Sequence, residues 1–339
     1  MEKHAKYFRR NLTAFPSAYT SYDSSLTSLA YFCLCGLELV DQKVDNREDC
    51  IRWIYSLLVP SGEGFRGSRS HELPVSENSR TYDPPSIAST FFCISMLAAM
   101  GDESMTQKLD RAKIMKFVVS CQKDNGAFCA LSDPNLGPIG DNDLRHAYMA
   151  AAIRHMLQWD TKGSEGCEGP DMDIEKAVSY VLSTRHVNGG FGDSPGAEAH
   201  SGLTFCGLSL LTLVGRLDVT DKAWEPTIEY LSKRQDDETG GFNGRVNKPV
   251  DTCYAWWNAA CLKMLNRANL IDWQGIDRYL ETTEHKVLGG YSKTAGGYPD
   301  PLHSYLGLAA KALKNDTVVA CLSLPQPGMA HLQRLNWNI

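Results

Sequence analysis

Features of two large protein classes are missing from this sequence. It has no run of basic residues, and its net charge is -6 at pH 7. Proteins that bind nucleic acid need a positive face for the phosphates, so we expect no nucleic-acid partner. Lys, Arg, Asp or Asn interrupts every apolar run before the roughly 20 residues that a membrane-spanning helix requires. We therefore also expect no membrane insertion.

Marks of secretion and lipid anchoring are missing as well. No apolar signal core follows Met1, and Glu2 stands where N-myristoylation requires glycine. The 11 cysteines show no regular disulfide spacing. Several lie in apolar stretches with helical spacing, as reduced thiols of cytosolic proteins do; these are Cys33, Cys35, Cys93, Cys206 and Cys261. We expect a soluble cytoplasmic protein.

The sequence does contain an internal repeat, built on small-residue turns that end in an aromatic residue. Successive aromatics are 63, 63, 51 and 49 residues apart, and they are Phe65, Phe128, Phe191, Phe242 and Tyr291. Ahead of each turn, apolar residues recur with helical spacing, as Ile114 and Phe117 do, and charged residues such as Lys116 occupy the opposite face. Each turn is therefore predicted to follow an amphipathic outer helix.

A second helix, apolar on nearly every side, is expected after each turn. The segments are 24–40 near the amino end, then 86–100, 143–157, 201–214, 252–265 and 302–313. A helix that is apolar all round is buried all round. The pattern predicts an all-α fold, an α–α toroid (α/α barrel) of about six helical hairpins around a central apolar cavity, as one domain over residues 1–339. An open superhelical array is the alternative.

Aromatic and polar residues recur at matching places in the inner helices. The aromatics are Phe91, Tyr148, Phe205, Tyr254 and Tyr305. They are candidates for the cavity wall, although aromatics at helical spacing are more often core. Polar residues gather at the helix starts, and these are Asp143, Arg145, Glu198, His200, Asp251, Cys253, Asp300 and His303. In a toroid all inner amino termini meet at one end, where their dipoles favour an anion; solvated helix caps are the alternative.

The segment Gly244–Trp257 concentrates chemistry within 14 residues. Its two cations, Arg245 and Lys248, could neutralise an anion. Asp251 and Cys253 could share a metal ion with the distant His303, and three such ligands with one open position are typical of catalytic zinc. The spacing is a weak basis, because a cysteine in an apolar helix is usually a small apolar side chain. A metal site and an ordinary core cysteine both stay open on spacing alone.

Three strings together resemble a known family, and they are Glu198–Gly207, Gly244–Tyr254 and Pro301–Tyr305. They resemble the β subunits of protein prenyltransferases, most closely the type I geranylgeranyl enzymes, and the similarity runs over nearly the whole chain. The resemblance implies an obligate heterodimer with a helical prenyltransferase α subunit. It implies transfer of geranylgeranyl from geranylgeranyl diphosphate to the cysteine of C-terminal Cys-a-a-X proteins such as small GTPases, with X mostly Leu.

The resemblance also implies roles for individual residues. Asp251, Cys253 and His303 match the ligands of one zinc ion per β subunit. The expected substrate-binding residues fall into groups: His200, Arg245, Lys248 and Tyr254 for the diphosphate, Trp257 for the isoprenoid, Arg145 for the peptide's carboxyl end, with Gly202 of the first string and the aromatic Tyr148 beside them.

Three positions separate geranylgeranyl from farnesyl transfer. Farnesyl enzymes have tryptophan near the start of the first inner helix, where this sequence has Ser28, or Thr27 with a one-residue shift. Leu302 stands where farnesyl enzymes have tyrosine. Lys293 stands where they have a magnesium-binding aspartate, so we expect its ammonium to act catalytically in that ion's place and magnesium not to be required. A solvated loop lysine is the alternative.

Other functions stay open beside this one. Ser86 and His146 change the polarity of the expected pocket for X, so a strict preference for Leu is an open question. A farnesyl or Rab geranylgeranyl β subunit is the nearest enzyme alternative, and a non-catalytic α–α repeat scaffold is the alternative without chemistry. A terpene cyclase of toroidal shape would need an Asp-x-Asp-Asp motif, which the sequence lacks.

Overall fold

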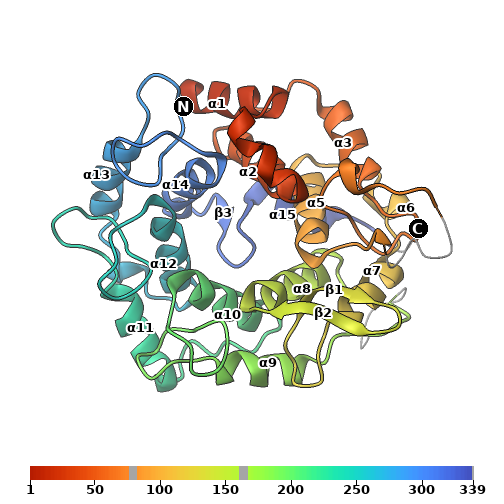
Figure 1. Cartoon of the computed structure of the whole chain (residues 1–339). Coiled ribbons are helices and arrows are strands. Elements are labelled where there is room, and N and C mark those ends of the chain that lie inside the picture. Colours follow the sequence, from red (N-terminus) through yellow and green to blue (C-terminus); the bar gives the residue numbers. More distant parts are fainter. Residues whose placement is uncertain (76–81, 160–166, 338–339) are drawn as a thin grey trace. The chain divides into compact units, whose positions relative to one another are not determined.

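The structure, a computed structural model, describes residues 1–75, 82–159 and 167–337 (Figure 1). The chain forms two compact units, each described here by itself. Unit 1 comprises Met1–Phe15, Phe32–Lys43 and Val181–Gln326, and unit 2 comprises Pro16–Tyr31, Val44–Tyr180 and Pro327–Ile339. The single domain expected from the sequence stays a prediction.

The alternation of outer and inner helices is confirmed in both units. Unit 1 contains α1 (Glu2–Thr13), α10 (Ser201–Leu213), α11 (Glu225–Ser232), α12 (Thr252–Met264), α13 (Trp273–Thr283) and α14 (Pro301–Leu313), with the short strands β3 (Val318–Val319) and β4 (Leu324–Pro325). Unit 2 contains α3 (Arg47–Ser56), α5 (Ile87–Ala99), α6 (Met105–Lys108), α7 (Arg111–Ser120) and α8 (Leu144–Met156). Both units share α2 (Leu26–Leu39) and α9 (Ile174–Ser183), and α15 (Gln326–Arg334) begins at the last residue of unit 1.

The inner helices are apolar because other helices cover them. In unit 1, α12 packs between α10 and α14, and in unit 2, α5 packs against α8 (Figure 1). The thiols predicted to lie in apolar helices are buried, and burial raises the pKa of Cys35 and of Cys93 well above the ordinary thiol value. Within the described ranges, no helix combines the length and apolarity needed to cross a membrane.

All five predicted turns are present, and each is closed by one antiparallel bridge between its aromatic residue and a residue one to three positions after the preceding outer helix. The turn aromatics are at most 3% exposed. Three of the turns are held by side-chain hydroxyl groups of the inner helices. Each hydroxyl accepts a hydrogen bond from the backbone N–H of the turn aromatic, in the pairs Phe65–Thr90 (3.0 Å), Phe191–Thr204 (2.9 Å) and Tyr291–Ser304 (2.9 Å). These bonds fix each turn at the start of the helix that follows it.

The hairpin of β1 (Cys129–Asp133) and β2 (Gly137–Asn142) was not predicted from the sequence. The strands pair antiparallel, with an irregularity between Cys129 and Leu131. Gly, Pro, Asp and Asn, which are poor strand formers, make up most of β2, so its sequence carries no strand pattern.

The amino-terminal helix α1 packs against the last turn, 286 residues away along the chain. A Cβ at Gly289, where φ is +74°, would lie 2.2 Å from the Lys3 carbonyl oxygen, so only glycine allows this approach. Gly240 meets α13 at Gly275 in the same way. Helix α1 therefore takes the place that an outer helix takes after an earlier turn.

His4 holds α1 in that place. Its side chain is buried, its Nδ1 accepts the Gly290 N–H at 3.0 Å, and its Nε2 lies 3.1 Å from Glu284. The ring stacks on Tyr291. Burial lowers the pKa of His4 to about 4, because desolvation outweighs the opposing effect of the Glu284 carboxylate. His4 is therefore neutral in the folded chain at pH 7.

Acid is expected to destabilise the chain through His4. In the unfolded chain His4 binds a proton near pH 6.5, whereas in the folded chain it binds one only near pH 4. The contribution of neutral His4 to the free energy of unfolding is therefore complete above pH 6.5 and falls as the pH drops below that value. We expect the free energy of unfolding to fall by about 2 kcal/mol from pH 7 to pH 5 through this residue. Urea unfolding at both pH values should show a smaller fall in His4→Gln. The control His71→Gln, at an exposed histidine, should match the parent, and an equal fall in His4→Gln would contradict the assignment.

Candidate metal and anion site

The polar residues at the inner-helix starts of unit 1 are N-caps. His200, Asp251 and Asp300 cap α10, α12 and α14, and each side chain accepts a backbone N–H two or three residues later at 2.9–3.0 Å. Capping explains why each polar group lies at a helix start. The capping alternative is therefore right about local structure, but capping does not require these side chains to approach one another.

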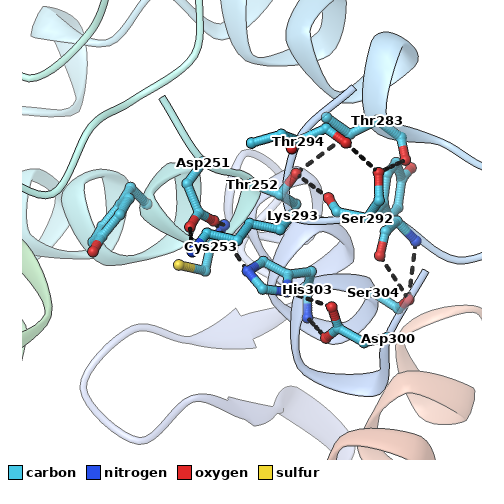
Figure 2. A network of polar contacts seen from close by, with 12 residues as sticks. Asp251, Thr252, Cys253, Thr283, Ser292, Lys293, Thr294, Asp300, His303 and Ser304 are labelled. Carbon is cyan, nitrogen blue, oxygen red and sulfur yellow. Dashed lines mark hydrogen bonds and ion pairs between the residues drawn. The ribbon is translucent and has the colours of Figure 1, made fainter. Parts of the chain in front are cut away.

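Asp251, Cys253 and His303 do converge, at the starts of α12 and α14 (Figure 2). One ligand atom of each lies within 4.8 Å of the other two. Asp251 and Cys253 are buried, and His303 Nε2 is 3.1 Å from Asp251 Oδ1. A carboxylate oxygen, a thiol sulfur and an imidazole nitrogen form a donor set that zinc accepts. The group is consistent with a zinc site.

Asp300 orients the imidazole ring of His303. Its Oδ2 lies 2.6 Å from His303 Nδ1, while its Oδ1 accepts the His303 backbone N–H (Figure 2). Because Asp300 holds Nδ1, Nε2 faces Asp251 and is the ring nitrogen left for a metal ion. Carboxylates fix ligating histidines in this way in metal sites. From the sequence, Asp300 was predicted only as a polar helix-start residue, although its place three residues before His303 is the available signal for this contact.

The protons of this group are coupled. Burial lowers the pKa of His303, but hydrogen bonds with Asp251, Asp300 and Cys253 outweigh burial and raise it to about 11. Burial raises the pKa of the Cys253 thiol to about 11. Burial also raises the pKa of the Asp251 carboxyl, but contacts with His303 outweigh it and leave that pKa below its ordinary value. A metal ion bound here has to replace the ring and thiol protons.

A second polar group surrounds Tyr254, the residue after Cys253. Its Oη lies 3.0 Å from His200 Nε2. Since His200 Nδ1 accepts the Gly202 N–H, the neutral ring carries its proton on Nε2 and donates it to Tyr254. Burial raises the pKa of Tyr254 to about 12. The phenol therefore keeps its own proton at neutral pH and can donate it to a further acceptor.

The loop that follows the fourth turn passes close to Tyr254 and carries two cations. A Cβ at Gly244 would lie 2.0 Å from the Tyr254 ring, so only glycine lets the loop approach. Arg245 Nη1 is 3.0 Å from Glu198 Oε2, and these side chains are 40% and 60% exposed. Lys248 is exposed. An ion pair so open to water is weak, so a stronger anion can draw Arg245 from Glu198.

Two further predicted residues belong to the same unit. Lys293 Nζ is 3.8 Å from Asp251 Oδ2, which links the fifth loop to the metal group. The half-buried Trp257 lies one helical turn beyond Cys253 and packs against Phe205, with ring centroids 4.9 Å apart. Unit 1 thus contains the residues predicted to bind the metal ion and the diphosphate, together with Trp257, which is predicted to contact the isoprenoid.

The other predicted residues lie in unit 2. Asp143 caps α8 and holds the Arg145 guanidinium at 2.7 Å. Tyr148 is buried edge-on against Phe91, which fits the core alternative. Thr27 and Ser28 lie in the first turn of α2. Thr27 is buried, whereas Ser28 is half-buried and its hydroxyl donates a hydrogen bond to the Ser25 carbonyl. Which of the two matches the tryptophan of farnesyl enzymes stays a prediction.

Comparisons with known proteins agree with this architecture. A family model described as the prenyltransferase alpha-alpha toroid domain matches residues 1–335, which confirms the predicted toroid. The geranylgeranyl transferase type-1 subunit beta of Dictyostelium discoideum is 34% identical over 95% of this chain and 94% of its own length. Its counterpart in Arabidopsis thaliana is 32% identical over 92% and 84%. The solved structure of Candida albicans protein geranylgeranyltransferase-I complexed with GGPP is similar with a TM-score of 0.87, at 29% identity and 98% coverage of both chains.

Proposed function

Because the chain belongs to the prenyltransferase α–α toroid family, we propose that it is the catalytic β subunit of a type I protein geranylgeranyltransferase. Its substrates are geranylgeranyl diphosphate and proteins ending in Cys-a-a-X, with X mostly Leu, such as small GTPases. Its obligate partner is a prenyltransferase α subunit, and it acts in the cytoplasm. The observation that carries the proposal is the convergence of Asp251, Cys253 and His303 next to Tyr254 and His200.

In this proposal the metal group prepares the nucleophile. Asp251, Cys253 and His303 would hold one zinc ion, and its charge would keep the substrate cysteine as a thiolate near neutral pH. Asp300 fixes the orientation of the His303 ring. The substrate sulfur forms a bond to C1 of the isoprenoid while the bond from C1 to the diphosphate oxygen breaks, and its electron pair leaves with the diphosphate.

The chain's cations and hydroxyl donors act on the departing diphosphate. Arg245 and Lys248 neutralise the charge that grows there, and the Tyr254 hydroxyl donates a hydrogen bond to it while His200 holds the phenol. Lys293 adds a positive charge from the next loop, so the reaction needs no magnesium. Trp257 lines the isoprenoid, and Arg145 binds near the peptide's carboxyl end.

Ser28→Trp is expected to change the choice of donor. A tryptophan in the first turn of α2 would shorten the isoprenoid pocket by about one isoprene unit, so the ratio of farnesyl to geranylgeranyl transfer should rise about tenfold or more, as a lost methylene-sized contact alone is worth about 10-fold. Competition between both diphosphates on one Cys-a-a-Leu peptide measures it. Thr27→Trp, made in parallel, decides the register. An unchanged ratio in both folded variants would rule out this wall.

Transfer by the purified heterodimer tests the proposal as a whole. The chain is co-expressed with the α subunit of the same host, its metal content is measured, and both donors are offered without added magnesium. We expect about one zinc per heterodimer and preference for geranylgeranyl diphosphate. A clear preference for farnesyl diphosphate would indicate a farnesyl enzyme. A stable complex with neither metal nor transfer would favour the repeat scaffold.

A further inference from the structure

Thr252 lies between two residues of the metal group but binds elsewhere. Its side chain is fully buried, and Figure 2 shows it directed toward the loop that carries Lys293. The Thr252 backbone N–H donates to the Lys293 carbonyl at 3.0 Å, and its hydroxyl donates to the Ser292 carbonyl at 2.7 Å. One residue therefore binds two consecutive carbonyls of this loop.

The loop is held from its other side as well. The buried Ser292 hydroxyl donates to the Thr294 carbonyl at 2.7 Å, and the Ser292 N–H donates to the Thr283 carbonyl at 2.9 Å (Figure 2). The Thr283 hydroxyl lies 3.1 Å from that of Thr252. A buried polar network whose members are all bonded is rigid. The backbone on both sides of Lys293 is thus fixed to α12 and to the end of α13.

The same contact occurs one repeat earlier. Ser201, which follows the N-cap of α10, donates its backbone N–H to the Gly244 carbonyl at 2.9 Å, and its hydroxyl lies 3.2 Å from that carbonyl and 2.9 Å from Asn258 Oδ1. Gly244 immediately precedes Arg245. In both repeats, the first residue after the inner-helix N-cap binds a backbone carbonyl of the next loop. That carbonyl belongs to Lys293 itself in one repeat and to the residue before Arg245 in the other. The recurrence indicates a positioning device and not an accident of one turn.

The Lys293 side chain itself offers little restraint. It is 68% exposed, and its ion pair with Asp251 is long, at 3.8 Å. Such a pair in water holds a lysine weakly. The position of the ammonium therefore depends on where the backbone of the loop is held, which is where Thr252 acts.

We propose that Thr252 is a positioning residue that places Lys293 for its action on the departing diphosphate. The inference rests on the proposed function, in which Lys293 supplies charge to the leaving group. A displacement of about 1 Å in a group that acts in the transition state can cost up to 10²-fold in rate, so loss of one hydrogen bond to the loop should be visible in kcat.

Thr252→Val tests this in the purified heterodimer, since it keeps the shape and the backbone N–H and removes only the hydroxyl. We expect kcat to fall about tenfold, with zinc content unchanged and KM for geranylgeranyl diphosphate within about twofold. Thr252→Ser should restore kcat. Thr90→Val, which removes an equally buried hydroxyl from α5, is the matched control and should leave kcat unchanged.

A double-mutant cycle with Lys293→Ala separates this role from a general structural one. If Thr252 acts through Lys293, Thr252→Val has no further effect on kcat once Lys293 is alanine. The inference would be overturned if the effects of the two substitutions on kcat multiply in the double variant. An unchanged kcat in Thr252→Val, or loss of zinc from that variant, would overturn it as well. Ser292→Ala, which loosens the loop from its other side, should reproduce the loss if Thr252→Val does not fold.

Failure of the proposed function gives different results. The unaltered heterodimer is assayed first, and absence of transfer there rejects the function and this inference together. Transfer that Lys293→Ala leaves unchanged rejects the leaving-group role of Lys293 and the inference, while the zinc-dependent function stands.

Discussion

Cys253→Ala is expected to lose the bound zinc ion and about a thousandfold of transfer activity, equivalent to about 4 kcal/mol of transition-state stabilisation. Cys253 supplies the sulfur of a group whose three ligand atoms lie within 4.8 Å of one another. Two ligands bind zinc far more weakly than three, and without the ion the substrate thiol is mostly protonated at pH 7. Metal analysis and single-turnover transfer on the same sample measure both losses.

The matched control is Cys261→Ala, two turns further along α12. Cys261 is more deeply buried than Cys253, and burial raises the pKa of its thiol well above the ordinary value. Its loss should lower stability but leave zinc and turnover intact. Asp251→Ala and His303→Ala should behave like Cys253→Ala. Retention of zinc and turnover in any of these three would refute the ligand assignment.

Arg245→Gln is expected to lower kcat/KM for geranylgeranyl diphosphate by about 10²-fold, as loss of one group that stabilises transition-state charge does. The Arg245 guanidinium forms an ion pair with the exposed Glu198 side chain, so it can leave Glu198 and bind a stronger anion. The same change should weaken competitive inhibition by inorganic diphosphate. Steady-state kinetics with both ligands separates binding from the chemical step.

Arg278→Gln provides the comparison for this variant. Arg278 lies on the outer helix α13 and pairs with Asp272 at 3.1 Å, with similar exposure to Arg245. The Arg278→Gln substitution removes one positive charge from the chain, as Arg245→Gln does, but leaves the charge near Tyr254 unchanged. Equal losses in the two variants would mean that only net charge matters, which would contradict a leaving-group role for Arg245.

Local sequence predicted the helices well because each inner helix is bounded by strong local features. The prediction of a helix over 252–265 compares with Thr252–Met264 in α12, where the Asp251 side chain begins the helix. Apolar residues on every side and a polar cap are both visible in sequence. The hairpin of β1 and β2 was not visible, since its pairing depends on two segments meeting and not on strand-forming residues.

The metal group shows where local reasoning ends. Spacing placed Asp251 and Cys253 on one helix start but gave no reason to choose His303, 50 residues further on, over other histidines. Only the resemblance made that choice, and the structure brings the three together. The clamp of Thr252 on the Lys293 loop had no sequence signal at all, because backbone carbonyls carry no residue identity.

The packing of α1 on the last turn has a consequence for how the protein is made. The ribosome adds Gly290 to the chain 286 residues after its partner His4. The apolar face of α1, with Tyr7 and Phe8 buried in the final structure, stays uncovered until that turn has been synthesised. Pairing over such a separation is slow and exposes apolar surface meanwhile. Synthesis of this chain therefore includes a long interval in which its first helix needs protection from aggregation.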